Sequence, residues 1–209
     1  MALNEDLKKA LVELRKGKER KFNQSVDLII NLQKFDAKKT PLNIFVSIPY
    51  KIKDKKIGAF LESKNKNVET ITGEEFKKYT EKKVLKKLVN DFDFFIAQAS
   101  LMPKVASTFG RVLGPAGKMP SPQLGIIMNP DDKTINELKI KINSSVKLRV
   151  KEPSLKLAVG KQNMKDEEII ENILAIYNAF LKALPKGLES IRNLEIKFTM
   201  TKPQKIKIK

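Results

Sequence analysis

The side chains that could do chemistry in this chain are lysines, arginines and carboxylates, because the sequence contains no Cys and no His. That composition excludes thiol catalysis, imidazole acid–base chemistry and the usual zinc sites. The 42 Lys and Arg outnumber the 24 Asp and Glu and give a net charge of +18. A surplus of this size attracts polyanions and speeds association with them. We therefore expect a nucleic acid as partner, with an anionic membrane surface as the second candidate.

The segment GRVLGPAGKMPSP, residues 110–122, invites comparison with a phosphate-binding loop. Val112 stands where a Walker loop needs its first Gly, and Met119 stands where it needs Ser or Thr, so the pattern fails twice. Its Gly and Pro residues instead predict a fixed, irregular loop that is exposed and carries Arg111 and Lys118. Both a secondary surface for RNA or tRNA and a purely structural turn remain open.

Two pairs of neighbouring acids, Asp131–Asp132 and Glu167–Glu168, could act as general acid and base. Both stand where a predicted helix begins, and acids there favour the positive end of the helix. We interpret them as helix starts and expect no enzyme, no cofactor and no metal.

A membrane role is also disfavoured. The basic run from Lys77 to Lys87 is interrupted by Glu81, and few large apolar residues are left over to insert into lipid. No apolar run reaches the roughly 18 residues that span a bilayer, and no apolar signal segment opens the sequence. We expect a cytoplasmic protein.

Alternating apolar residues predict strands near both ends of the chain. They are Val26, Leu28, Ile30 and Leu32; Ile44, Val46 and Ile48; Val146, Leu148 and Val150; Leu155, Leu157 and Val159; and Leu194, Ile196, Phe198 and Met200. Apolar residues at helical spacing predict one helix over residues 3–14 and a longer one from Asp166 to Leu184. An N-terminal hairpin with one helix would be marginal alone. We therefore expect residues 1–48 and 146–209 to form one split α+β domain with an antiparallel sheet and two helices, which we call domain I.

The middle of the chain alternates strands with helices. Short apolar strands are predicted at 57–61, 68–71, 94–97 and near 126–128. Helices are predicted at 74–89, from Leu101 to Leu113 and, after Asp131–Asp132, around Ile135–Leu138. This order implies parallel pairing and a three-layer, Rossmann-like α/β domain over residues 49–145, which we call domain II. Because the chain crosses between the domains twice at nearly the same place, the crossings would make a natural hinge.

Two features suggest a working surface on domain I. Lys147, Arg149 and Lys151 place three positive groups on one face of a predicted strand. The segment Thr199–Thr201 ends another strand in short side chains, which let a protein backbone approach sugar and phosphate closely. A solvated face and an ordinary strand end are the alternative interpretations.

Four segments together resemble one family. LMPKVASTFGRVLGPAGKMPSP (residues 101–122) is similar to the signature of the ribosomal protein L-one family, the protein of the large subunit's mobile stalk. KFNQSVDLIINL (21–32), LAVGK (157–161) and FTMTKP (198–203) agree with it in the same order. The resemblance covers essentially the whole chain and implies the same interrupted plan of two domains.

The resemblance implies a cytoplasmic, non-enzymatic constituent of the large ribosomal subunit, monomeric when free of the ribosome. It implies binding to large-subunit ribosomal RNA at the stalk, contact with deacylated tRNA leaving the exit site, and repression of the protein's own messenger. The implied RNA contacts are Lys21, Phe22, Ser25, Lys151, Asn193, Thr199, Met200 and Thr201. Family members commonly have Ser at position 193 and Gly at 201, where a side chain would hold the backbone further from RNA. The alternative is a phosphate- or nucleotide-handling enzyme on the α/β domain.

Overall fold

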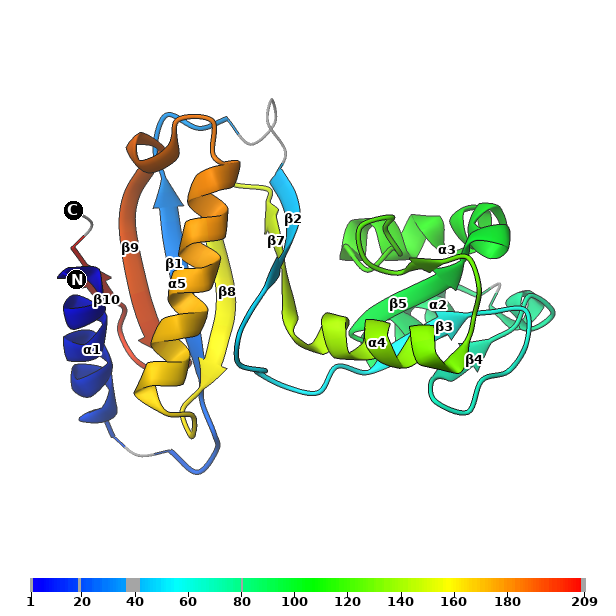
Figure 1. The fold of residues 1–209 in the computed structure, drawn as a ribbon, viewed down its shortest axis with the longest axis horizontal. Helices are drawn as coiled ribbons and strands as arrows, with labels where there is room; N and C mark the ends of the chain where they lie inside the picture. Colours follow the sequence, from blue (N-terminus) through cyan, green and yellow to red (C-terminus); the bar gives the residue numbers. More distant parts are fainter. Residues whose placement is uncertain (1, 19, 37–41, 80, 208–209) are drawn as a thin grey trace. The chain divides into compact units, whose positions relative to one another are not determined.

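The computed structural model describes residues 2–18, 20–36, 42–79 and 81–207 (Figure 1). The chain forms two compact units: unit 1 is Met1–Ile52 with Ser144–Lys209, and unit 2 is Lys53–Asn143. The domain boundaries expected from the sequence, after residue 48 and before residue 146, stay predictions. The expected fold class is confirmed: an α+β unit built from both chain ends is interrupted by an α/β unit.

Unit 1 is built on a four-stranded antiparallel sheet. Its strands, in the order β10-β9-β1-β8, are β10 (Gln204–Ile206), β9 (Ile191–Phe198), β1 (Ser25–Leu32) and β8 (Ser154–Lys161). Every second residue of β1 is fully buried, which is the pattern of a strand with one face in a core. A separate antiparallel ribbon pairs β2 (Leu42–Ser47) with β7 (Ser145–Val150).

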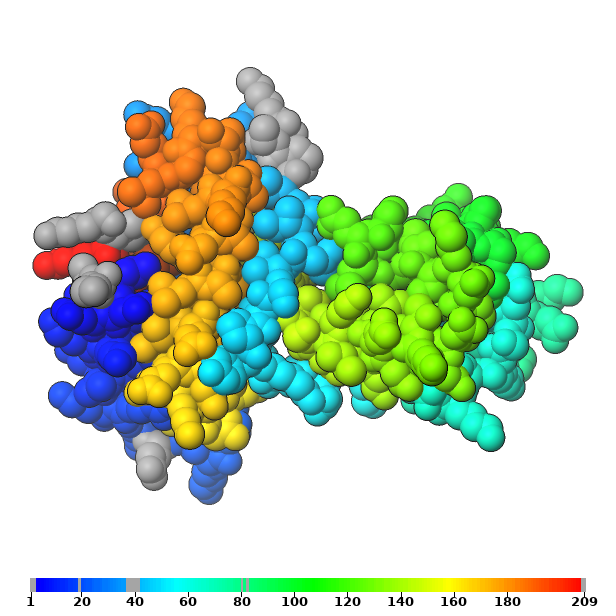
Figure 2. Space-filling model, in the orientation of Figure 1, coloured from blue at the N-terminus to red at the C-terminus, as the bar shows by residue number. Residues whose placement is uncertain are grey.

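Two helices supply the rest of this core. Helix α5 (Asp166–Ala183) runs across one face of the sheet, and α1 (Ala2–Arg15) packs beside it and against β9 and β10 (Figure 1). Apolar residues of both helices share one cluster with the buried residues of the strands. On the side of unit 1 seen in Figure 2, α5 and α1 conceal most of the sheet. The opposite face of the sheet is called the outer face below.

Unit 2 has a parallel sheet between two layers of helices. Its strands, in the order β4-β3-β5-β6, are β4 (Glu69–Ile71), β3 (Ile57–Phe60), β5 (Phe94–Gln98) and β6 (Ile126–Ile127). One core joins the sheet to α2 (Lys82–Asp91) and α3 (Met102–Ala116), and a second joins it to α4 (Asp132–Asn143). The sheet with helices packed on both of its faces forms the three layers expected from the sequence.

The single helix expected over residues 74–89 is wrong. A 3-10 turn, η1 (Glu75–Lys78), is followed by α2, and Glu81 between them is extended. Phe76 and Leu85 are both buried in the same core. Nine residues apart on one continuous helix, they would point to opposite sides at about 100° per residue. Breaking the helix lets both side chains reach the core.

The helix expected from Leu101 to Leu113 is α3 in the structure, and α3 continues to Ala116, so the irregular loop expected over residues 110–122 is wrong for its first half. The buried residues of α3 are Val105, Phe109 and Leu113. They form a continuous apolar stripe, and burial of that stripe outweighs the low helix propensity of Gly110. The helix ends at Gly117, whose φ of 73° is a left-handed cap that glycine adopts without strain.

Candidate RNA-binding surface

The outer face of the β10-β9-β1-β8 sheet carries the polar half of each strand's alternation. Both helices of unit 1 contribute to the core on the other face. The half-buried residues on the outer face are Ser25, Asp27, Ile29 and Asn31 of β1, and Asn193, Glu195 and Lys197 of β9. Asn193 and Thr199 lie on this face six residues apart, which is about 20 Å at the usual rise of a strand. The predicted contact residues therefore form two groups, one at each end of the face.

The first group is held together by hydrogen bonds between the start of β1 and the end of β9. The backbone N–H of Ser25 donates to Thr199 Oγ1 (3.1 Å), and the N–H of Thr199 donates to the Ser25 carbonyl (3.1 Å). Lys161 Nζ donates to Ser25 Oγ from the end of β8 (2.9 Å). The hydroxyls of Ser25 and Thr199 are thus fixed in place rather than free to rotate.

Gln24 extends this frame, and only its place beside Ser25 in the sequence indicated such a role. Its side chain is 2% exposed, and its Oε1 accepts the backbone N–H of Met200 (3.0 Å). Its Nε2 donates to Gln162 Oε1 (3.3 Å), and its carbonyl accepts the Gln162 N–H (2.8 Å). A buried amide with these partners positions the backbone of Met200.

Two large apolar side chains stand out from this frame into solvent. Phe22 is 50% exposed and Met200 is 57% exposed, and both flank the hydrogen-bonded residues. Lys21 is also exposed beside Phe22. An aromatic ring and a thioether held in this way suit stacking against nucleobases, while a neighbouring ammonium suits phosphate.

Thr201 does not form the strained turn that a side chain at a Gly position suggests. Among the described residues with side chains, only Lys34 has a positive φ. Thr201 Oγ1 accepts the backbone N–H of Phe198 (2.9 Å), and the Thr201 N–H donates to the Phe198 carbonyl (3.2 Å). Its hydroxyl therefore closes a local turn instead of pointing toward a ligand.

The second group, at the other end of the face, is smaller. Asn193 is the pairing partner of Asn31, which also pairs with Ser154 at the start of β8. Lys151 is exposed in the connection that precedes Ser154. Asn193 Nδ2 donates to Glu195 Oε1 (3.0 Å), while its Oδ1 is buried and has no hydrogen-bond partner among the described residues.

Between the two groups lies a carboxylate that the sequence-based list did not contain. Asp27 pairs across the sheet with Lys197 of β9 and Ala158 of β8. Burial raises the pKa of the Asp27 carboxyl above its usual value, although Lys197 and Lys161 act in the opposite direction. The alternation of β1 alone would have placed Asp27 on the same face as Ser25.

Arg111 and Lys118, the two residues of the possible secondary surface for RNA or tRNA, have different roles. Arg111 is exposed on α3 of unit 2. Lys118 is not the exposed loop residue that we expected: its Nζ donates to the carbonyls of Val89 (2.6 Å) and Phe92 (2.7 Å). These carbonyls lie at the C-terminal end of α2, where helical acceptors lack partners and a cation is favoured. Lys118 is therefore a helix cap.

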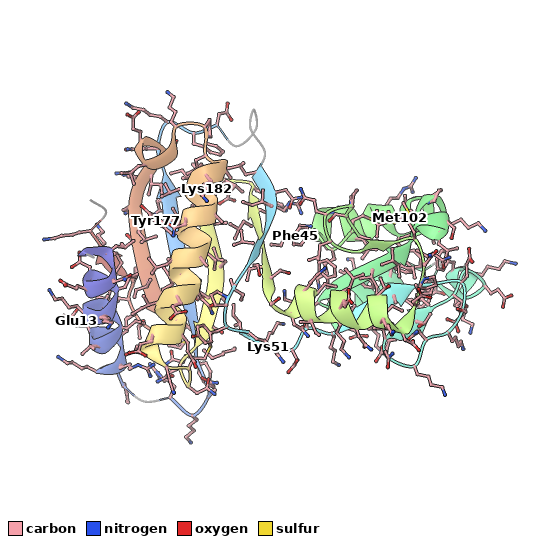
Figure 3. All side chains as sticks on the ribbon, viewed as in Figure 1. Glu13, Phe45, Lys51, Met102, Tyr177 and Lys182 are labelled. Atoms are coloured by element: carbon pink, nitrogen blue, oxygen red, sulfur yellow. The ribbon has the colours of Figure 1, made fainter. Side chains whose placement is uncertain are left out.

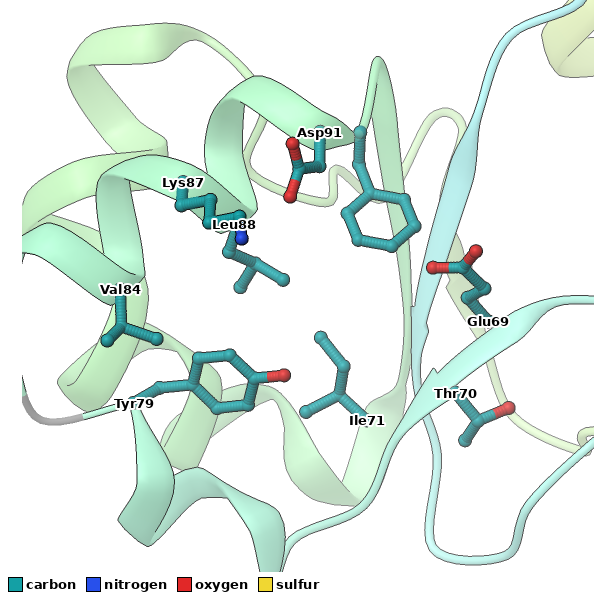
Figure 4. Close-up of a pocket in the computed structure, with 9 residues that line it drawn as sticks. Glu69, Thr70, Ile71, Tyr79, Val84, Lys87, Leu88 and Asp91 are labelled. Atoms are coloured by element: carbon teal, nitrogen blue, oxygen red, sulfur yellow. The ribbon is translucent and has the colours of Figure 1, made fainter.

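Two cavities of unit 2 bear on the alternative of a phosphate- or nucleotide-handling enzyme. A hollow of about 430 Å³ beside the edge strand β4 has an apolar floor of Ile71, Leu88 and Phe92, and its rim carries the carboxylates of Glu69 and Asp91 (Figure 4). A larger cleft lies beyond the carboxyl ends of β3 and β4, where α/β folds bind ligands. Glu62 and Glu74 line it together with Lys64, Lys77 and Lys104, and Pro103 removes an N–H donor from the start of α3. Side chains of both charges line this cleft, and the lining does not identify a ligand.

Within the described ranges, we find no group of three His, Cys, Asp or Glu residues arranged to hold a metal ion. In the same part of the chain, no helix has both the length and the apolar character needed to cross a membrane.

Comparison with known proteins identifies the family of the chain. The model of the ribosomal protein L1p/L10e family matches residues 14–202. The chain is 36% identical to the large ribosomal subunit protein uL1 of Pyrobaculum calidifontis, over 96% of this chain and 92% of that protein. It is 35% identical to that of Methanothermococcus thermolithotrophicus, over 97% and 98%, and 34% identical to that of Nanoarchaeum equitans, over 89% and 92%. The chain belongs to the ribosomal protein L1p/L10e family.

Proposed function

We propose that this chain binds large-subunit ribosomal RNA at the mobile stalk through the outer face of the β10-β9-β1-β8 sheet. Membership of the family makes the chain a structural component of the large ribosomal subunit, in the cytoplasm. The proposed contact residues are Lys21, Phe22, Ser25, Lys151, Asn193, Thr199 and Met200, with Thr201 shaping the turn that presents Met200.

One observation carries this proposal. Phe22 and Met200 stand half exposed on either side of a frame of fixed hydrogen bonds. Isolated exposed apolar residues are common, but here the backbone N–H of Met200 is held by the buried side-chain amide of Gln24, which lies two residues after Phe22. A rigid platform with short polar groups suits a folded RNA that is recognised by shape, ribose hydroxyls and unstacked bases.

The finer parts of the proposal concern tRNA and messenger RNA. We propose that unit 2, with Arg111 exposed on α3, faces deacylated tRNA at the exit site. Repression of the protein's own messenger requires that its leader offer the same sheet face a fold like that of the stalk. Both parts rest on the family resemblance and on the strong positive charge of the chain.

The test compares stalk RNA with an unrelated duplex across a salt series. Both affinities should fall as salt rises, because bound phosphates release counterions, and stalk RNA should remain the tighter ligand throughout. Phe22→Ala should weaken stalk RNA by about 1–3 kcal/mol, the usual cost of losing one base–aromatic stack, and leave the duplex nearly unchanged.

Val12 provides the matched control, since it is also 50% exposed but lies on α1. Val12→Ala should leave both affinities as in the parent. If stalk RNA and duplex lose affinity in parallel and never separate, the chain recognises charge alone. If Val12→Ala costs as much as Phe22→Ala, the surface is misplaced.

A further inference from the structure

The centre of the outer face is hollowed. A depression of about 470 Å³ lies between the two groups of proposed contact residues. Asp27 and Ile29 of β1, Lys156 and Ala158 of β8, and Lys197 of β9 line it. Ile29 pairs with Lys156, and Asp27 pairs with Ala158, so these four side chains emerge side by side from neighbouring strands. The hollow thus has an apolar floor, one carboxylate and two ammonium groups.

The carboxylate is the unusual part of this site. Within the described residues, Asp27 makes no side-chain hydrogen bond and no ion pair, although Lys197 stands directly opposite it in the pairing. Burial of a carboxylate without such partners is unfavourable, which agrees with the raised pKa of Asp27. On a face that receives phosphates, a negative group would also repel the ligand. Asp27 is half-buried, so its carboxylate can accept a hydrogen bond from a neutral donor of the partner.

Resting on the proposed binding of stalk RNA, we propose that this hollow holds one unpaired guanine whose Watson–Crick edge is recognised by Asp27. An ionised carboxylate only accepts hydrogen bonds, through two oxygens side by side. Among the four RNA bases, guanine alone presents two parallel donors, N1–H and the 2-amino group, that match both oxygens. These donors are free only in a loop, a bulge or an end, which is where proteins read RNA sequence.

The other lining residues fit the same ligand. Ile29 and Ala158 offer an apolar floor on which the plane of a base can lie. A lone ribose hydroxyl would need no such floor and would use one carboxylate oxygen. Lys156 and Lys197 flank the hollow on the strands on either side of β1, where they meet the phosphates before and after the base.

The experiment uses the full chain and a fragment of the stalk RNA in which each unpaired guanine is replaced, one at a time, by inosine. Inosine lacks only the 2-amino group. With the parent protein, one replacement should weaken binding by about tenfold, the loss expected for one hydrogen bond to a charged group. Asp27→Asn cannot accept both donors, so it should bind the unsubstituted fragment more weakly than the parent does. For this variant, the same inosine replacement should lower the affinity little further.

Two controls make the result specific. Glu13→Gln removes one negative charge from α1 (Figure 3) and should leave the whole inosine profile as in the parent. Asp27→Asn should not melt at a lower temperature, because the raised pKa means that folding disfavours the charged form and the amide is neutral.

The outcomes separate this inference from the proposed function. The guanine site is wrong if the parent binds stalk RNA specifically but no inosine replacement lowers its affinity. It is also wrong if each inosine replacement lowers the affinity of Asp27→Asn as much as that of the parent. If 2′-deoxy substitution couples to Asp27 and inosine does not, the carboxylate reads a ribose and the guanine assignment is overturned. If the parent itself does not prefer stalk RNA to duplex, the proposed function fails first.

Discussion

At the scale of single residues, Thr199 both faces outward and joins two strands. Its Oγ1 accepts the Ser25 N–H across the end of the sheet. Thr199→Ala should therefore lower the free energy of unfolding by about 1 kcal/mol, and it should also weaken stalk RNA by about 1–3 kcal/mol because a fixed acceptor is lost. Thr199→Ser keeps the hydroxyl and should restore both values. Urea unfolding and RNA titration of the three proteins check this; a Ser variant as weak as the Ala variant would assign the effect to the methyl group.

The same scale shows what the sequence can and cannot predict about the candidate site. Matching motifs predicted Phe22 and Met200, which are half exposed, because such residues occur in a recognisable order along the chain. Lys118 shares a motif with Arg111, yet its ammonium caps α2, whose end is 26 residues away or more in sequence. Asp27 shows the opposite case: it lies in the candidate site but belongs to no recognisable motif, because a single acid within an alternating strand is common. Contacts between distant segments decide both cases.

At the scale of elements, α5 fixes the chain shortly before it leaves unit 1. Asn172 on α5 is fully buried, and its Oδ1 accepts the Tyr50 N–H (3.0 Å). Its Nδ2 donates to the carbonyls of Tyr50 (2.9 Å) and Val159 (3.0 Å). One amide thus binds β8, α5 and the segment after β2 together.

Asn172→Ala should be strongly destabilising, because it leaves three backbone groups without a partner in a buried site. We expect the free energy of unfolding to fall by roughly 3 kcal/mol, at about 1–3 kcal/mol for each unsatisfied group with partial relaxation. Asn178 lies exposed on the same helix, and Asn178→Ala should change stability by less than about 0.5 kcal/mol. Urea unfolding measures both. Equal effects would mean that water replaces the amide of Asn172.

The elements themselves were predictable where one period persists. Strict alternation predicted β1 and β9, although β9 ends at Phe198 and Met200, expected on its apolar face, is exposed. The acids Asp166 to Glu168 marked the start of α5. The prediction of one helix failed between Phe76 and Leu85. These residues lie on two separate helical segments, and each segment turns its buried side chain toward the same core. The apolar stripe predicted the helix as far as Leu113, but the loop expected from Gly110 onward was wrong as far as Ala116, because Gly114 and Pro115 within a helix resemble a loop.

At the scale of the whole molecule, two segments connect the units, and within each unit hydrogen bonds hold these two segments together. In unit 1 the Ile48 N–H donates to the Ser144 carbonyl (2.7 Å), next to the paired ribbon of β2 and β7. In unit 2 the Lys55 N–H donates to Asn143 Oδ1 (3.0 Å), and Lys55 Nζ donates to the Ile142 carbonyl (2.7 Å). Burial lowers the pKa of Lys55, an effect that Asp93 opposes. Neither closure uses a residue of the other unit.

Replacing residues 53–143 by a short Gly-Ser linker should therefore leave unit 1 folded. The clamp of Asn172 on Tyr50 and the Ile48–Ser144 hydrogen bond hold both cut ends in place, so the linker joins points that are already positioned. A flexible connection between fixed ends adds little entropic cost, which grows only slowly with its length. The shortened protein should unfold in one cooperative transition in urea. It should bind stalk RNA within about threefold of the parent, a change below 1 kcal/mol, while losing any contact with tRNA. The whole outer face remains in it, so a folded protein without specific RNA binding would show that recognition needs unit 2.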